Sequence, residues 1–259
     1  MQLQDQMHRT IRLDEPPKRV VSLVPSQTEL LHYLGLEVEV VGITKFCIHP
    51  ASWFQTKNRV GGTKNISIDK VKALNPDFII GNKEENTPED IEALSAIAPI
   101  YMSDVNTIQD AFQFIKDMGE LFQLQQKTEP LLDTLQSRFS GVNNIVNHQT
   151  VAYLIWQEPY LLAGKNTFID AMLSHIGFTN WTDESRYPAW NQKEKKDPDF
   201  IFLSSEPFPF HETHRHQLQT EYPNSKVVLV DGELFSWYGS RMLAFPDYVK
   251  QLLNQLGIQ

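Results

Sequence analysis

The feature that most constrains the fold is a regular alternation of short apolar runs with longer amphipathic ones. This pattern is typical of βα units built around mainly parallel sheets. The expected strands of the first half are Arg19–Val24, Val38–Ile43, Asp77–Gly81 and Ile100–Ser103. Those of the second half are Val151–Trp156, Phe200–Ser204 and Lys226–Val230. We therefore predict an α/β fold.

Helix-start signals follow these strands. A hydroxyl or carboxylate at the residue before a helix can accept a hydrogen bond from a free backbone N–H of the first turn. The expected helix caps are Ser26, with Glu29 completing a capping box, Ser67, Thr87 and Thr167. We expect Glu29 to serve only this helix start.

The two halves also share a weak internal repeat. Residues 75–81 (NPDFIIG) resemble residues 197–203 (DPDFIFL), and residues 31–36 (LHYLGL) resemble residues 173–178 (LSHIGF). Because both matches occur in the same order, we predict two similar lobes.

A helical pattern with almost no glycine separates the halves. It covers residues 107–149, and Pro130 falls where the first turn of a second helix tolerates proline. We expect a first lobe over residues 1–122, one long bridging helix over 123–149 and a second lobe over 150–259. A ligand cleft between the lobes, with limited closure, would follow.

Composition excludes several classes of partner. The 259 residues carry a formal net charge of −9 with no long basic cluster, which argues against nucleic acid and anionic membranes. No apolar run approaches the roughly 20 residues of a membrane span. Cys47 is the only cysteine, so no intrachain disulfide is expected. The first residues lack the pattern of a signal peptide.

Ligands of open parallel sheets bind beyond the carboxyl ends of the strands. In the first lobe, the candidate ligand-binding residues at such positions are Pro25, Ser26, Gln27, Phe46, His49, Gly62, Thr63, Lys64, Glu84 and Glu85. Glu84 lies eight residues after Pro76, as Glu206 does after Pro198. Two interpretations of this matched pair stay open, cleft-lining acids or solvated loop acids.

The second lobe is rich in aromatic residues outside its periodic segments. Its candidate ligand-binding residues are Trp156, Tyr160, Arg186, Tyr187, Glu206, Phe208, Trp237, Tyr238 and Arg241. Loop aromatics interleaved with arginine suit a flat, partly apolar ligand that carries carboxylates or amides.

Catalytic and metal motifs give little support to an enzyme. No Gly-x-Ser-x-Gly elbow and no acid, base and nucleophile stand out. The segment His211–His216 holds three histidines, but without a His-Glu-x-x-His motif we expect a polar helix start and no metal site.

Several segments resemble one family. The run 19–29 (RVVSLVPSQTE), the segments 41–44 (VGIT) and 60–62 (VGG), and above all 68–80 (IDKVKALNPDFII) are similar to the solute-binding proteins of ABC importers for cobalamin and ferric siderophores. The long interlobe helix fits the same family. The likeness is looser in the second lobe.

This resemblance implies a binding protein without catalysis, a permease as partner, and no resident cofactor, since the ligand itself contains cobalt or iron. It places a permease-docking acid at Asp69, where the family usually has glutamate. It also implies a periplasmic or cell-surface location, whereas the missing export signal leaves the cytoplasm open.

The leading hypothesis is thus capture of a corrinoid, ferric siderophore or related metal chelate for an ABC importer. The alternative is a cytoplasmic enzyme or sensor of metal-chelate metabolism, such as a chelatase-like protein, which reuses a two-lobed fold.

Overall fold

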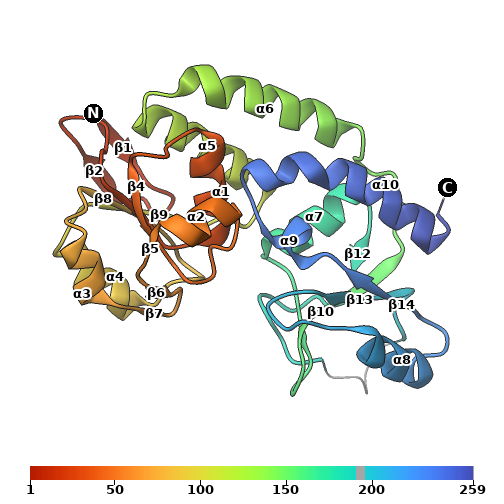
Figure 1. The fold of residues 1–259 in the computed structure, drawn as a ribbon. Helices are drawn as coiled ribbons and strands as arrows, with labels where there is room; N and C mark the ends of the chain where they lie inside the picture. Colours follow the sequence, from red (N-terminus) through yellow and green to blue (C-terminus); the bar gives the residue numbers. More distant parts are fainter. Residues whose placement is uncertain (191–195, 259) are drawn as a thin grey trace. The chain divides into compact units, whose positions relative to one another are not determined.

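The computed structural model describes residues 1–190 and 196–258 and resolves them into two compact units. The first unit contains Met1–Val105, Gln109–Thr134 and Trp237–Arg241. The second contains Asn106–Ile108, Leu135–Ser236 and Met242–Gln259, apart from the undescribed residues. Both are α/β with mainly parallel sheets, as the alternating pattern predicts (Figure 1).

The first unit begins with a short hairpin and continues through βα units. Its strands are β1 (Gln2–Gln4), β2 (Thr10–Arg12), β3 (Val20–Ser22), β4 (Val40–Ile43), β5 (Asn58–Arg59), β6 (Gly61–Gly62), β7 (Asn65–Ile66), β8 (Phe78–Asn82) and β9 (Ile100–Ser103). Its helices are α1 (Pro25–Tyr33), α2 (Ala51–Thr56), α3 (Ile68–Ala73), α4 (Pro88–Ser95) and most of α5 (Ile108–Leu121).

The chain passes into the second unit within α6 (Gln125–Ser140). The strands there are β10 (Thr150–Trp156), β11 (Leu161–Leu162), β12 (Thr179–Asn180), β13 (Phe200–Ser204) and β14 (Lys226–Val230). The helices are α7 (Phe168–Ile176), α8 (Glu212–Glu221), α9 (Gly232–Ser236), the 3-10 turn η1 (Ser240–Ala244), which starts in the first unit, and α10 (Phe245–Leu256).

Both main sheets are five-stranded. The order in the first unit is β5-β4-β3-β8-β9, and all of its neighbours pair in parallel. The order in the second unit is β11-β10-β13-β14 with β12 also on β10, and only β11 is antiparallel. The carboxyl ends of the parallel strands therefore meet at one edge in each unit.

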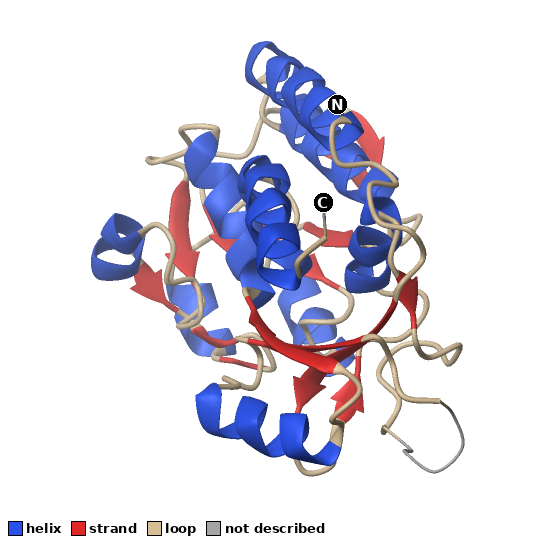
Figure 2. Cartoon of the chain, turned by 90° about the vertical axis from the view of Figure 1, so that its right-hand side faces the viewer, coloured by secondary structure: helices blue, strands red, loops and turns tan. Residues whose placement is uncertain are grey.

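Alternate residues of each strand face opposite helical layers. In the second unit, Ala152 and Ile201 pack with Leu218 of α8. Tyr153 points the other way and contacts Phe235 of α9 with ring centroids 5.3 Å apart. Figures 1 and 2 show α8 on one face of this sheet and α7, α9 and α10 on the other.

The predicted repeat is confirmed in the strand register of each unit. Phe78 of one Pro-Asp-Phe segment pairs with Val20 of β3, and Phe200 of the other pairs with Val151 of β10. The aspartates of these segments have matching roles. Asp77 accepts hydrogen bonds from the backbone N–H groups of Lys18 and Arg19, both at 2.9 Å. In the second unit, Asp199 accepts from the backbone N–H of Thr150 at 2.7 Å and from its hydroxyl at 2.8 Å.

The helix starts agree with the sequence at three of the four expected positions. Thr87 and Thr167 are N-cap residues whose hydroxyls accept hydrogen bonds from the backbone N–H groups of Asp90 and Asp170. Ser67 is the N-cap residue of α3, as predicted, but its hydroxyl makes no cap hydrogen bond. The capping box at Ser26 is wrong. Helix α1 starts two residues earlier, with Val24 and not Ser26 at the N-cap, because the fixed φ of Pro25 suits the first helical position.

The bridging helix is shorter than predicted. Helix α6 ends at Ser140, and the turn that follows at Gly141 stops the pattern well before His148. Pro130 lies inside α6 and not in its first turn, so the carbonyl of Gln126 receives no intrahelical N–H there. Residues 123–134 belong to the first unit.

We predict that Asp77→Ala and Asp199→Ala each lower the free energy of unfolding by about 1 kcal/mol, because each removes an acceptor of two hydrogen bonds. Urea denaturation measures the loss, and amide exchange near Val20 or Val151 assigns it to one unit. Asp133→Ala, at an exposed position of α6, is the control and should change stability by less than about 0.5 kcal/mol. Equal losses in all three variants would contradict the register role.

Candidate functional site

A buried polar network closes the carboxyl ends of β3, β8 and β9 in the first unit. The side-chain amide of Gln27 on α1 donates to the Gly81 carbonyl at 3.0 Å, to Ser103 Oγ at 2.8 Å and to the Tyr238 hydroxyl at 2.9 Å. Asn82 at the end of β8 donates to the same Ser103 and Tyr238 oxygens at 2.9 and 3.2 Å. Burial raises the pKa of Tyr238 to about 12, so its hydroxyl stays protonated.

Two asparagines shape the loop that carries the predicted acids. Asn82 Oδ1 accepts from the backbone N–H groups of Glu84 and Glu85 at 2.8 and 3.1 Å. Asn86 Oδ1 accepts from Asn82 N at 2.8 Å, and its amide donates to the Thr63 carbonyl at 2.9 Å. Both asparagines are buried, so the loop is fixed from below while its acids lie nearer the surface.

Glu85 lies beside Thr63 and Lys64. Part of its surface is exposed, yet the protein around the carboxyl raises its pKa, chiefly by desolvation. The Lys64 charge and a hydrogen bond from Thr63 act in the opposite direction and lower the pKa. The three predicted residues thus interact with one another at this edge of the sheet, Lys64 through its charge and Thr63 through a hydrogen bond.

The segment 45–49 presents apolar side chains to solvent at the same edge. Phe46 is 51% exposed and Ile48 is 46% exposed. The Lys45 ammonium lies 5.0 Å from the centre of the Phe46 ring. Gly62 lies beneath this pair, because a Cβ there would come within 3.2 Å of the Phe46 ring and 3.3 Å of Lys45.

The segment Trp237–Arg241 belongs to the first unit, although the sequence places it in the second lobe. Arg241 pairs with Glu29 at 2.9 Å, and its guanidinium lies 5.0 Å from the Trp237 ring centre. Trp237 also contacts His49 edge to face, with ring centroids 5.8 Å apart. The helix-start role expected of Glu29 is therefore wrong, and its carboxylate holds this segment instead.

In the second unit, Glu206 follows β13 as Glu84 follows β8. Ser236 at the end of α9 donates to Glu206 Oε1 at 2.7 Å, and Ser204 Oγ donates to the Glu206 carbonyl at 2.5 Å. The carboxylate is half-buried and held in place. Glu84 and Glu206 thus occupy matching strand ends in their own units, and their part in ligand binding stays a prediction.

Aromatic rings line the strand-end loops of the second unit. Trp156, 42% exposed at the end of β10, contacts Phe208 with ring centroids 5.9 Å apart. Phe208 continues into Phe210 and His214 at 4.8 and 5.4 Å. Tyr160 is half-buried and stacks toward Phe210 at 6.5 Å.

Arg186 and Tyr187 form a second exposed pair in this unit. Arg186 donates to Asn106 Oδ1 at 2.8 Å and to the Asn166 carbonyl at 2.7 Å, and its guanidinium lies 5.6 Å from the Tyr187 ring centre. Tyr187 is 38% exposed. A fixed cation beside an exposed ring is suited to a ligand with both apolar and anionic parts.

The histidine segment starts α8, as predicted. His211 is the N-cap residue, and its backbone N–H donates to His214 Nδ1 at 3.1 Å. Burial, and next the neighbouring His211, lower the pKa of His214. Over residues 1–190 and 196–258, no group of three or more His, Cys, Asp or Glu side chains is placed to hold a metal ion.

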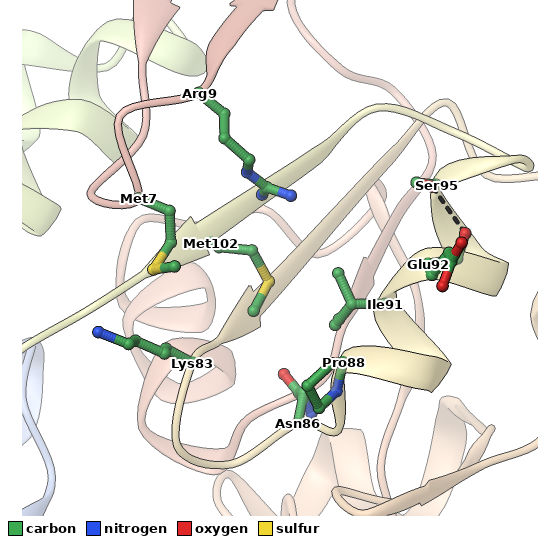
Figure 3. Close-up of a pocket in the computed structure, with 9 residues that line it drawn as sticks. All are labelled: Met7, Arg9, Lys83, Asn86, Pro88, Ile91, Glu92, Ser95 and Met102. Carbon is green, nitrogen blue, oxygen red and sulfur yellow. Dashed lines mark hydrogen bonds between the residues drawn. The ribbon is translucent and has the colours of Figure 1, made fainter.

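A pocket of about 300 Å³ lies in the first unit, and none of the predicted ligand residues lines it, although Lys83 and Asn86 at its edge flank Glu84 and Glu85. Figure 3 shows Met7 and Arg9 from the β1–β2 hairpin, Met102 from β9 and Ile91 from α4 around it. Arg9 pairs with Asp5 at 2.7 Å within the hairpin, and Asp5 Oδ2 accepts from the backbone N–H of Met102 at 3.1 Å, which ties the hairpin to β9.

Among the predicted ligand residues, the structure separates surface groups from buried ones. Those that reach the surface at least in part are Pro25, Phe46, His49, Lys64, Glu84, Glu85, Trp156, Tyr160, Arg186, Tyr187, Glu206, Phe208 and Arg241. Those that are buried are Ser26, Gln27, Gly62, Thr63, Trp237 and Tyr238. The sequence reasoning missed Asn82, Asn86 and Ser103. Two asparagines around a strand-end loop were the available signal, since such side chains bond to nearby backbone.

Sequence relatives with curated names are binding proteins. An uncharacterized ABC transporter substrate-binding lipoprotein, YvrC of Bacillus subtilis, is 24% identical over 71% of this chain. That match spans 64% of the lipoprotein, less than two thirds of its length. A vitamin B12-binding protein of Pectobacterium carotovorum is 22% identical over 93% of this chain and 90% of its own.

Solved structures share the fold. The periplasmic vitamin B12-binding protein BtuF of Vibrio cholerae matches with a TM-score of 0.79 and 21% identity, over 94% of this chain and 99% of BtuF. The petrobactin-binding protein YclQ of Bacillus subtilis matches with a TM-score of 0.75 and 18% identity, over 99% and 96% of the two chains.

Two α/β units with mainly parallel sheets are the fold that this chain shares with these solved binding proteins. The family model described as periplasmic binding protein matches residues 20–222, and the chain belongs to that family. Within the part of the chain that is described, no helix is long and apolar enough to cross a membrane.

We predict that Gly232→Ala lowers the free energy of unfolding by about 1–3 kcal/mol. A Cβ at Gly232 would lie 2.3 Å from Ser204 Oγ and 2.7 Å from Glu206 Cγ, so the loop that holds the Glu206 carboxylate must shift. Thermal and urea denaturation measure the loss. Gly141→Ala is the control, because its nearest contact is the Arg138 carbonyl at 3.4 Å. A Gly232 variant as stable as the Gly141 variant would show that the loop is not closely packed.

Proposed function

We propose that this protein is the solute-binding component of an ABC importer and that it captures a corrinoid, a ferric siderophore or a related metal chelate. One observation carries the proposal: each unit exposes an apolar ring in a loop, with a cation beside it. Phe46 lies with Lys45 in the first unit, and Tyr187 lies with Arg186 in the second.

The physical chemistry of this arrangement favours large, partly flat ligands. A half-exposed ring still has apolar area in contact with water after folding. A ligand that covers this area gains about 25 cal/mol of binding free energy per Å². Lysine and arginine beside the ring can pair with carboxylates on the rim of such a ligand. Corrinoids and ferric chelates combine an apolar body with polar or charged edges, so both features have a counterpart.

The relatives support capture over the chelatase-like alternative. The vitamin B12-binding and petrobactin-binding proteins are named for what they bind, and the family model that matches is one of binding proteins. The ligand would bring its own cobalt or iron, so the protein needs no resident cofactor. Absence of catalysis and delivery to a permease are parts of this proposal.

We predict saturable binding of at least one member of a panel of cyanocobalamin, haemin, a ferric catecholate and a ferric hydroxamate. Phe46→Ala and Trp156→Ala should each weaken that binding about tenfold, or about 1.4 kcal/mol, because each removes an exposed ring at a strand end. Titration calorimetry and tryptophan fluorescence measure Kd.

Tyr33→Ala is the matched control, since Tyr33 is 48% exposed but lies at the far end of α1. It should bind as the unmodified protein does. No saturable binding by any member of the panel would sink the ligand class, and equal losses in all three variants would sink the assignment of the rings.

This protein should stimulate ATP hydrolysis by the importer. We predict that Asp69→Lys lowers that stimulation several-fold and leaves the Kd for the ligand unchanged. Asp69 is exposed in the first turn of α3, where it can meet a basic partner surface. The measurement uses the importer reconstituted in vesicles at two salt concentrations, because exposed charge pairs weaken with salt. Asp133→Lys on α6 is the control. Full stimulation by the Asp69 variant would exclude this acid from docking.

A further inference from the structure

Tyr238 ends in the buried network and not at the surface. Its side chain is 6% exposed, and its hydroxyl lies 2.9 Å from Gln27 Nε2, 3.2 Å from Asn82 Nδ2 and 2.9 Å from Ser103 Oγ. These partners come from α1, β8 and β9, and the sequence separation reaches 211 residues. One hydroxyl therefore connects three elements of the first unit to the segment Trp237–Arg241.

The Gly81 carbonyl can only accept, so it fixes the Gln27 amide with its nitrogen inward. The Gln27 and Asn82 amides both donate to the Tyr238 oxygen, and the Tyr238 and Ser103 hydroxyls share a hydrogen bond at 2.9 Å. Among the described residues, Gln27 Oε1 has no hydrogen-bond partner although it is fully buried. The Tyr238 hydroxyl is one of three oxygens that contact the buried Gln27 amide nitrogen.

Trp237 and His49 lie directly beyond this anchor. The Trp237 ring is buried, carries the Arg241 guanidinium 5.0 Å from its centre and contacts His49 at 5.8 Å. His49 is half-exposed and belongs to the segment that presents Phe46 to solvent. A continuous run of contacts thus leads from the buried hydroxyl to the exposed apolar edge.

We infer that Tyr238 is a positioning residue that acts through Trp237 and His49 and sets the form of the ligand-facing segment 45–49. It does not touch the ligand. The inference rests on the proposed function for its effect on affinity, but its first step, control of the Trp237 ring, is independent of any ligand. The chemistry it governs is the fit of an apolar ligand face against Phe46 and His49.

Tyr238→Phe isolates the hydroxyl. The ring of Tyr238 packs edge to face on Phe114 with centroids 5.3 Å apart, and phenylalanine keeps that contact. Tyr248→Phe is the matched control, because the Tyr248 hydroxyl accepts one hydrogen bond from the Asp231 N–H at 2.8 Å in the second unit.

The experiment labels all five tryptophans with 5-fluorotryptophan and records ¹⁹F NMR spectra of the ligand-free protein. Trp237→Phe assigns the Trp237 resonance. Tyr238→Phe should shift or broaden this resonance and leave the other four unchanged, whereas Tyr248→Phe should leave it in place. Tyr238→Phe should also weaken binding of the panel member bound best, among cyanocobalamin, haemin and the two ferric chelates, by about tenfold.

An unmoved Trp237 resonance in Tyr238→Phe overturns the inference, whatever happens to affinity. A moved resonance with an unchanged Kd also overturns it, because the hydroxyl would then hold only the fold. If no panel member binds the unmodified protein, the proposed function fails, and the Trp237 resonance alone decides whether Tyr238 controls the ring. Should Tyr238→Phe not fold, Ser103→Ala removes the hydroxyl that bonds to Tyr238 and should give a smaller change in the same resonance.

Discussion

In each unit, one aspartate sets the register between two neighbouring parallel strands. Asp77 precedes β8 in the first unit, and Asp199 precedes β13 in the second. Asp77 and Asp199 both bond to the beginning of the neighbouring strand, which aligns β8 with β3 and β13 with β10. Once two parallel strands start together, their carboxyl ends finish at the same level. The residues that follow those ends then gather at one edge, among them Glu84 after β8 and Glu206 after β13.

Buried polar groups and exposed rings have different roles at these edges. Gln27, Asn82 and Ser103 have their polar groups inside, where hydrogen bonds are directional and leave one arrangement. Phe46 and Trp156 keep much of their surface in water, where a ligand can cover it. Apolar contacts are non-directional, so the rings alone do not fix how a ligand lies. The positions of the loops that carry the rings are fixed by the buried hydrogen bonds.

The sequence predicts features with a local cause. Strand positions, the caps at Thr87 and Thr167 and the Pro-Asp-Phe repeat all follow from neighbouring residues, and the structure confirms them. Long-range features were out of reach. No local pattern indicates that Trp237–Arg241 belongs to the first unit. None indicates that Gln27 donates a hydrogen bond to a tyrosine 211 positions away. The start of α1 was missed because Pro25 overrides the capping signal beside it.

Hydrogen–deuterium exchange with and without each panel ligand tests the central claim, capture at the strand ends, most directly. The account predicts that one ligand slows amide exchange in the loops at 44–49 and 82–86 of the first unit and at 156–160 and 204–208 of the second. Strands β4 and β14, away from their carboxyl ends, should exchange as before. Protection confined to the pocket between Arg9 and Ile91, or no protection by any ligand, would contradict the account.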